Sequence, residues 1–276
     1  MAEPVLEVSG LRKTFGTHPA VDDVSFTVPA GGSLGIVGES GSGKTTTARI
    51  IVGLENPDAG HVRVDGHDRI NAGRGRAERL RRAQQVQMVF QDPYLSLDPR
   101  ITVGAALTET LRLHHPGTDQ AARVTDLLSQ VGLGAREAQA LPRQLSGGQR
   151  QRVAIARALA VSPRVLVLDE AVAALDVSVQ AQILNLLADL RAELGIAYVF
   201  ITHDLGVVRC VTDEVAVMRR GAIVERGLTA SVLAEPEHPY TRLLLESVPG
   251  PGWDPKAIVT ARKALAAVEQ SADAQS

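Results

Sequence analysis

The chain has 276 residues, is 45% hydrophobic and carries a formal net charge of −2. It can therefore bury one or two cores, but it lacks the excess of basic residues that binds nucleic acid through bulk electrostatics. No apolar run approaches the roughly 18 residues that span a bilayer, and the start of the chain shows no signal-peptide pattern. The single cysteine, Cys210, excludes an intramolecular disulfide and a multi-cysteine metal site.

The first third of the chain is rich in strand patterns separated by turn residues. Short apolar runs predict strands at 5–8, 25–28, 33–37, 62–64 and 86–90. A helical pattern follows at 45–54, and the arginine-rich stretch 74–82 indicates the solvated face of a second helix. The third of these strands is apolar after Ser33, which is typical of a strand buried on both faces.

The rest of the chain alternates helices with strands. Residues 91–141 have a helical and loop-rich pattern, and 177–194 predicts a long amphipathic helix. Further strands are predicted at 165–168, 197–201, 215–218 and 223–225, the last two as a hairpin. This alternation predicts a largely parallel sheet covered on both faces. Beyond Gly227 a proline-punctuated extension ends in an alanine-rich tail, 257–276, which is expected to be a frayed helix or disordered.

A phosphate-binding loop is predicted between an apolar strand and the helix that follows it. The run from Gly38 to Thr45 matches the pattern Gly-x4-Gly-Lys-Thr in full. Its glycines allow backbone N–H groups to surround an anion, Lys44 can reach the β- and γ-phosphates, and Thr45 can offer its hydroxyl to Mg²⁺. Only four of the 29 basic residues are lysines, and a compact ammonium suits this site better than a guanidinium. The residues expected to contact the nucleotide are Gly38, Glu39, Ser40, Gly41, Ser42, Gly43, Lys44, Thr45 and Thr46.

Acidic and polar residues follow three other predicted strands. Asp169 and Glu170 come directly after a buried strand, where an Asp can hold Mg²⁺ and a Glu can deprotonate the attacking water. His203 follows a second strand. A single His is more often a structural residue, but among predicted phosphate and metal ligands a contact with the γ-phosphate is favoured. Gln91 follows a third strand and is expected to bind water or Mg²⁺. The alternative is that Gln91 is an ordinary polar residue of a loop. The expected catalytic residues are Glu170, His203 and Gln91, and the expected metal ligands are Thr45, Gln91 and Asp169.

A second anion-binding feature lies later in the chain. The run Leu145-Ser-Gly-Gly-Gln149 indicates the start of a helix, with a serine hydroxyl and two glycines. Such a start binds phosphate because its N–H groups are unpaired and the helix dipole is positive there. The chain therefore carries two features suited to phosphate.

The order and spacing of these motifs resemble those of the nucleotide-binding subunits of ABC transporters. The resemblance covers about residues 5–227. It implies an α/β fold: a P-loop NTPase (RecA-like) core with a mostly parallel sheet, an antiparallel β region, an inserted helical subdomain and a short C-terminal extension. The implied domains are the ATP-binding core at 1–90 and 161–227, the helical signature subdomain at 91–160, and the extension at 228–276.

The same resemblance assigns roles that the residues alone leave open. It implies that the second anion-binding feature caps the γ-phosphate of an ATP held by a partner subunit, through Ser146, Gly147, Gly148 and Gln149. Asp176 would lie in a loop that faces this partner, and Phe15 would stack on adenine, with a core or turn position as the alternative for Phe15. Two positions depart from the family: Ala171 stands where proline is usual and Ala173 where serine is usual. Neither departure removes a catalytic group.

The extension narrows the resemblance to the importers of dipeptides, oligopeptides and nickel. The runs 89–100, 176–182 and 237–249 resemble that subfamily, the last through His238-Pro-Tyr240. Some members carry a C-terminal cysteine cluster that this chain lacks, which implies the shorter of the two ATPase subunits that such systems pair.

The resemblance implies an ATPase with ATP and Mg²⁺ as cofactors, at the cytoplasmic face of the membrane. Its implied partners are a second ATPase subunit, identical or homologous, two membrane-embedded permease subunits and an extracytoplasmic solute-binding protein; nucleic acid is not expected.

Two alternatives to this function stay open. One is an ATP-binding accessory protein of phosphonate metabolism, which has a similar tail. The other is an ABC-type ATPase acting on nucleic acid, although the chain shows one cassette and no sustained heptads.

Overall fold

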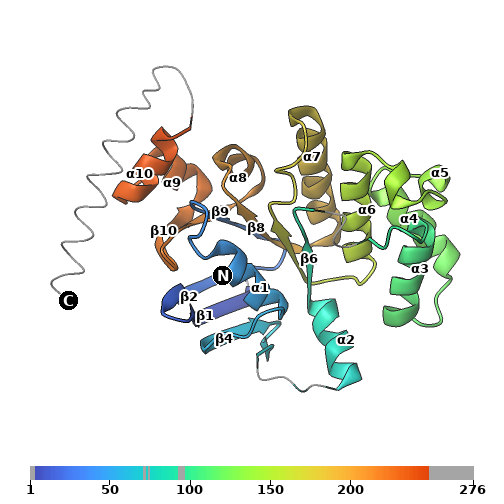
Figure 1. Ribbon diagram of the computed structural model, residues 1–276, viewed down its shortest axis with the longest axis horizontal. Helices are drawn as coiled ribbons and strands as arrows, with labels where there is room; N and C mark the ends of the chain where they lie inside the picture. The colour runs from blue at the N-terminus through green and yellow to red at the C-terminus, as the bar shows by residue number, and fades with distance from the viewer. Residues whose placement is uncertain (1–3, 71–72, 74, 93–96, 249–276) are drawn as a thin grey trace.

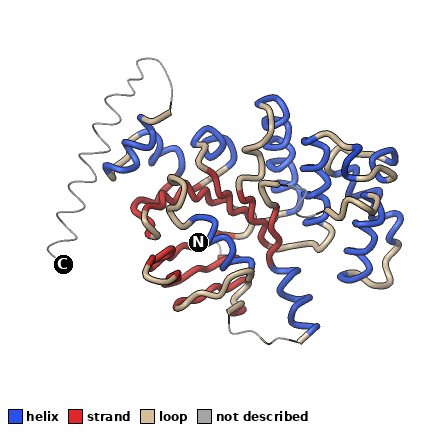
Figure 2. The backbone as a smooth tube through the Cα atoms, in the orientation of Figure 1, coloured by secondary structure: helices blue, strands red, loops and turns tan. Residues whose placement is uncertain are grey.

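Two β-sheets organise the chain, and Figures 1 and 2 show them as two layers with helices around them. The computed structural model describes residues 4–70, 73, 75–92 and 97–248. An antiparallel sheet has the strand order β2-β1-β4-β5, and a six-stranded sheet has the order β10-β9-β3-β8-β7-β6. The strands are β1 (Pro4–Phe15), β2 (His18–Pro29), β3 (Ser33–Val37), β4 (Ala59–Val64), β5 (His67–Asp68), β6 (Val86–Val89), β7 (Val165–Asp169), β8 (Ala197–Thr202), β9 (Glu214–Arg219) and β10 (Ala222–Leu228).

The six-stranded sheet is parallel from β9 to β6, and only β10 runs antiparallel to its neighbour. Every residue of β3, β7 and β8 is buried. Continuous apolar runs form such strands because parallel sheets are covered on both faces. The predicted α/β fold with a mostly parallel sheet and an antiparallel β region is therefore confirmed.

Helices cover the six-stranded sheet on one side, and the antiparallel sheet and α1 pack on the other (Figure 1). One core joins β6–β8 to α3, α4, α6 and α7, and a second joins the two sheets to α1. A third core lies under α8, α9 and α10. The helices are α1 (Lys44–Val52), α2 (Arg76–Gln85), α3 (Val103–His114), α4 (Gln120–Gln130), α5 (Ala135–Ala138), α6 (Gly147–Leu159), α7 (Val177–Leu194), α8 (Leu205–Val211), α9 (Thr229–Ala234) and α10 (Pro239–Glu246).

Several element boundaries differ from the prediction. β1 and β2 are each 12 residues long, because they pair with each other over their length and the pairing continues past the apolar runs. Helix α1 ends at Val52, since Gly53 adopts a left-handed conformation that closes the helix. In the described part of the chain, no helix combines the length and the hydropathy that crossing a membrane requires. The alanine-rich tail at 257–276 lies outside the described residues.

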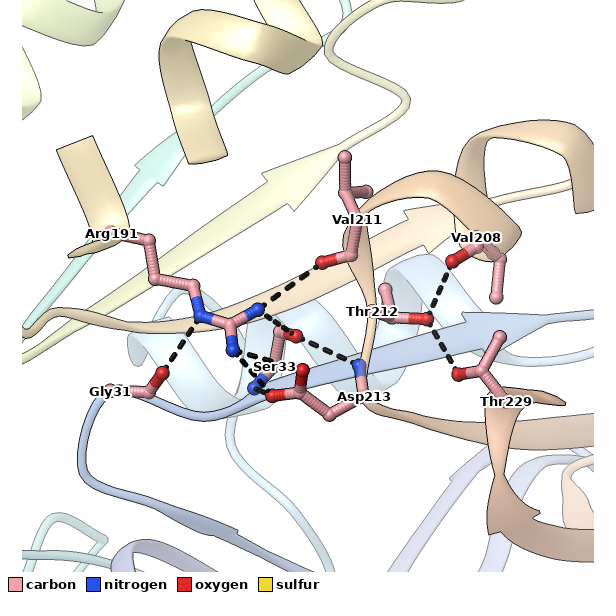
Figure 3. A network of polar contacts seen from close by, with 8 residues as sticks. All are labelled: Gly31, Ser33, Arg191, Val208, Val211, Thr212, Asp213 and Thr229. Atoms are coloured by element: carbon pink, nitrogen blue, oxygen red, sulfur yellow. Dashed lines mark hydrogen bonds and ion pairs between the residues drawn. The ribbon is translucent and has the colours of Figure 1, made fainter. Parts of the chain in front are cut away.

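Arg191 ties the end of α7 to the starts of β3 and β9 (Figure 3). Its guanidinium donates to the carbonyl of Gly31 at 2.7 Å and to the Ser33 hydroxyl. It also binds both carboxylate oxygens of Asp213, at 2.9 and 2.6 Å, and Asp213 in turn accepts from the backbone N–H of Ser33. A planar guanidinium with several donors can satisfy this set of acceptors, whereas an ammonium cannot match its geometry.

Replacing Arg191 with Lys is therefore expected to lower the free energy of unfolding by about 1–2 kcal/mol, because two or more hydrogen bonds are lost while the charge is kept. Urea unfolding of the purified chain measures this difference. The control is Arg209→Lys, an exposed position on α8, which should change stability by less than about 0.5 kcal/mol. Equal stability of the two variants would contradict the bracing role of Arg191.

Candidate functional site

The predicted site residues converge because their strands are parallel and in register. Val37 of β3 pairs with Thr202, Asp169 of β7 pairs with Ile201, and Val89 of β6 pairs with Leu168. The residues that follow these strands therefore emerge at one edge of the sheet. Ligands of open α/β sheets bind outside the carboxyl ends of the strands, which is this edge.

Tight packing explains two glycines of the loop after β3. A Cβ atom added to Gly38 would lie 2.1 Å from the carbonyl oxygen of Met218. One added to Gly43 would lie 2.2 Å from the carbonyl oxygen of Ala20, and Gly43 has a φ of 104°. Backbone atoms cannot yield to such contacts, so only glycine fits at either position. The loop is thereby held between the β9–β10 hairpin and the start of β2.

Helix α1 presents an uncapped N-terminus to the same space. It begins at Lys44 after the N-cap Gly43, and no side chain in the described structure caps it. The N–H groups of its first turn have no intrahelical acceptors, and the helix dipole is positive here. The Lys44 ammonium adds a full positive charge, donating to the carbonyls of Gly38 and Glu39 at 2.8 Å each. Burial lowers the pKa of Lys44, and the carboxylates of Glu170 and Asp169 oppose this shift.

A hydroxyl and a carboxylate meet beside Lys44. The Thr45 hydroxyl donates to Asp169 Oδ1 at 3.5 Å. Burial raises the pKa of Asp169, the charge of Glu170 raises it further, and the hydrogen bond from Thr45 lowers it. A buried carboxylate crowded by a second one is stabilised by a cation, and oxygen donors of this kind suit a hard divalent ion. The donor set therefore fits Mg²⁺.

Glu170 and His203 lie against each other at this edge. His203 Nδ1 is 3.2 Å from Glu170 Oε1, and the His203 side chain is 61% exposed. The Glu170 backbone has a φ of 47°, and its N–H donates to the carbonyl of Ile201 at 2.8 Å. A left-handed conformation at a glutamate costs free energy, and such outliers cluster at functional sites. The residue after it, Ala171, is buried.

The second predicted phosphate feature starts α6. The Ser146 hydroxyl accepts from the N–H of Gln149 at 3.2 Å, and the Gln149 side chain accepts from the N–H of Ser146 at 2.9 Å. This reciprocal pair is a capping box, which fixes the start of the helix. The expected helix start is confirmed, and the structure adds that Ser146 and Gln149 already bond to each other's backbone.

Asp176 belongs to the same neighbourhood as the α6 start. A Cβ atom added to Gly148 would lie 2.5 Å from Val179 Cγ1, so the start of α6 packs on the first turn of α7. Asp176 caps that turn by accepting from the N–H of Val179 at 3.0 Å, and this bond lowers the pKa of the Asp176 carboxyl. Ser146, Gln149 and Asp176 bond to the backbone of their own helix starts, whereas Lys44 bonds to the carbonyls of Gly38 and Glu39 in the phosphate loop. The structure therefore forms two separate groups within one chain.

Gln91 and Phe15 lie at the margins of the first group. Gln91 follows β6 and is exposed, at the sheet edge that also carries Asp169. Phe15 ends β1 with 49% of its surface exposed, and the Lys13 ammonium lies 5.2 Å from its ring centroid. The β1–β2 turn leads to Ala20, which contacts the loop at Gly43. The exposed ring rules out the core position for Phe15, and its place directly before the β1–β2 turn is compatible with both stacking and a turn position.

One residue beside the loop was not predicted. Tyr240 of α10 lies against it, with its hydroxyl accepting from the N–H of Glu39 at 3.0 Å. From the sequence, His238-Pro-Tyr240 indicates only a turn before an amphipathic helix. The available signal was its resemblance to the tail of a transporter subfamily, which gives no position in space.

Comparison with known proteins agrees with this geometry. A family model described as ABC transporter matches residues 21–173, and one described as the C-terminal region of oligopeptide/dipeptide transporters matches residues 224–273. The glutathione import ATP-binding proteins GsiA of Shigella flexneri and Escherichia coli (strain K12) are each 49% identical over 261 residues. The match covers 90% of this chain and 41% of each relative, so the chain spans about two fifths of their length.

Solved structures show the same fold. CbiO1 from Clostridium perfringens, part of the ABC transporter complex cbiONQ, aligns with a TM-score of 0.76 at 28% identity, covering 84% of this chain and 92% of that one. The ATP-binding cassette MJ0796, as a dimer in a post-hydrolysis state with ADP and Pi, aligns with a TM-score of 0.72 at 29% identity, covering 81% and 98%. The predicted P-loop NTPase fold is thereby confirmed, and the chain belongs to the ABC transporter family of ATPases.

Proposed function

We propose that this chain is the ATP-hydrolysing subunit of an importer that takes up peptides or a related small solute such as nickel. One observation carries the proposal: a phosphate loop with adjacent carboxylates and the C-terminal region of oligopeptide/dipeptide transporters occur in one chain, and the two are in contact through Tyr240. The 49% identity with glutathione import proteins supports a peptide-type cargo. The subunit would lie at the cytoplasmic face of the membrane, held there by its permease partners.

Hydrolysis would take place between two such subunits. The loop amides and Lys44 neutralise the phosphates, and Glu170 takes the proton of the attacking water. His203 holds the Glu170 carboxylate and reaches the γ-phosphate side. Mg²⁺ bound by Thr45, Asp169 and Gln91 would add positive charge against the phosphates.

A partner subunit would complete the site. The α6 start at Ser146–Gln149 is fixed by its own capping box and packs on the first turn of α7, so the phosphate-binding end of the helix is preformed, which supports a role on the ATP of the partner. Asp176, which caps the neighbouring helix, would then face that partner. The dimeric form of the related cassette MJ0796 supports this arrangement.

Permease subunits would bind next to Gln91. A groove of about 490 Å³ lies there, and apolar and charged side chains share it, namely Met88, Phe90, Ile101, Glu109, Leu113 and Arg157. The groove lies between β6 and the helices α3 and α6. Movement of these helices would therefore be transmitted to a permease segment bound in the groove. This is the surface through which closure over ATP would drive transport.

The proposal is tested by assembling the chain with permease subunits and a solute-binding protein of a peptide importer from the same organism, in proteoliposomes that contain ATP. Uptake of labelled glutathione, a dipeptide or Ni²⁺ is measured, with the Lys44→Ala chain as the inactive control. ATP-dependent uptake of a peptide is the expected result. Co-purification with enzymes of phosphonate breakdown instead of membrane subunits, or tight and salt-sensitive binding of nucleic acid, would overturn it.

A further inference from the structure

The C-terminal helix α10 reaches back to the phosphate loop through one buried side chain. Tyr240 is 1% exposed and packs in the third core with Val37, the last residue of β3. Its hydroxyl accepts from the backbone N–H of Glu39 at 3.0 Å. Glu39 is the second residue of the loop, so a segment beyond the nucleotide motifs touches the loop at its start.

The position of Tyr240 is itself fixed by the β9–β10 hairpin. The Arg219 guanidinium lies 4.4 Å from the centroid of the Tyr240 ring, a cation–π arrangement. The Glu225 carboxylate accepts from the N–H groups of Glu237 and His238, at 2.8 and 3.1 Å. The His238 side chain caps α10 by accepting from the N–H of Tyr240 at 3.1 Å. The ring is therefore held by its own helix start and by the hairpin.

The hydrogen bond acts on a peptide unit that also faces Lys44. The N–H of Glu39 and the carbonyl of Gly38 belong to one planar peptide group, and the described peptide bonds are trans. In a trans peptide these two groups point in opposite directions. The Tyr240 hydroxyl holds one end, and the Lys44 ammonium binds the other at 2.8 Å. Fixing the N–H thus fixes the direction in which the Gly38 carbonyl faces Lys44.

We infer that Tyr240 is a positioning residue for ATP binding: its hydroxyl sets the Gly38–Glu39 peptide and thereby the loop and Lys44. The inference rests on the nucleotide-binding part of the proposed function and is independent of the cargo. Glycine at position 38 has no side chain to restrain its backbone, so the loop depends on contacts from outside it. The C-terminal segment supplies one of these contacts.

The test is the variant Tyr240→Phe in the full chain, which keeps the ring and removes the hydroxyl. The dissociation constant for ATP, measured by calorimetry, is expected to rise about three- to tenfold, the effect of one lost hydrogen bond. In the assembled complex the KM for ATP should rise by a similar factor, and kcat should change less. The matched control is Tyr198→Phe: Tyr198 is also 1% exposed, and its hydroxyl has no hydrogen-bond partner among the described residues.

Amide exchange provides a second readout, and its first arm needs only the wild-type chain. The Glu39 amide of the wild-type chain, without nucleotide, should be protected from exchange, and this protection should be lost in Tyr240→Phe ahead of any global change. Fast exchange of that amide in the wild type, or equal ATP affinity in both tyrosine variants and the wild type, would overturn the inference. A wild-type chain that fails to bind ATP would instead overturn the proposed function.

Discussion

Replacing Glu170 with Gln is expected to leave ATP binding intact and to lower hydrolysis in the assembled complex by at least about a hundredfold. An amide has the shape of the carboxylate but cannot take a proton from water. ATP binding should tighten slightly, because the variant removes a negative charge that would repel the phosphates. The same charge already raises the pKa of the neighbouring Asp169 carboxyl. Phosphate release and nucleotide affinity are measured on the same preparation.

The matched control for this variant is Glu193→Gln, an exposed carboxylate near the end of α7 and away from the sheet edge. It should hydrolyse ATP at the wild-type rate. Full activity of Glu170→Gln would show that Glu170 is not the base. A loss of ATP binding in that variant would show that its main role is in holding the nucleotide.

Replacing Ser146 with Arg should spare nucleotide binding by the isolated chain and prevent ATP-driven dimer closure. The reason is the position of Ser146 at the N-terminus of α6, where a bulky cation would stand between the helix start and the phosphate of the partner. Dimer formation with ATP is followed by analytical ultracentrifugation in the Glu170→Gln background, in which the nucleotide is not consumed.

Two companion variants separate helix stability from phosphate contact. Ser146→Asp keeps a good N-cap, so it should preserve the helix and still block closure through charge repulsion with phosphate. Ser129→Arg adds the same side chain at an exposed position of α4 and should leave closure unchanged. Weakened ATP binding by the isolated Ser146→Arg chain would contradict the assignment of this motif to the partner's nucleotide.

The parts of the site that the sequence predicts are those that depend on local spacing. Gly38, Gly43 and Lys44 lie in one short run, and the run itself determines a strand, a turn and a helix start. Asp169 and Glu170 were predictable because a buried strand points its next residues at the carboxyl edge of the sheet. The capping box at Ser146 and Gln149 likewise follows from a spacing of three residues.

Contacts between distant segments were not predictable in this way. Arg69 stands in no predicted element or motif, yet it is 3% exposed and donates to the carbonyls of Ile51 and Arg82 and to Gln85. Burial lowers its pKa to about 10, so its charge is kept at neutral pH. Helix α2 is consequently more than a solvated surface, since its last turn accepts from this guanidinium. Only the tertiary arrangement brings these groups together.

The bond between Glu39 and Tyr240 joins residues 201 positions apart, and this separation has a consequence for the order in which the protein is made. During synthesis the phosphate loop, both carboxylates and His203 are added to the chain before Tyr240. A nascent chain therefore holds every nucleotide motif while the backbone N–H of Glu39 still lacks the Tyr240 hydroxyl as its acceptor. Translation of the C-terminal segment is the step that completes the loop, which ties the maturation of the nucleotide site to the synthesis of the segment that marks the transporter subfamily.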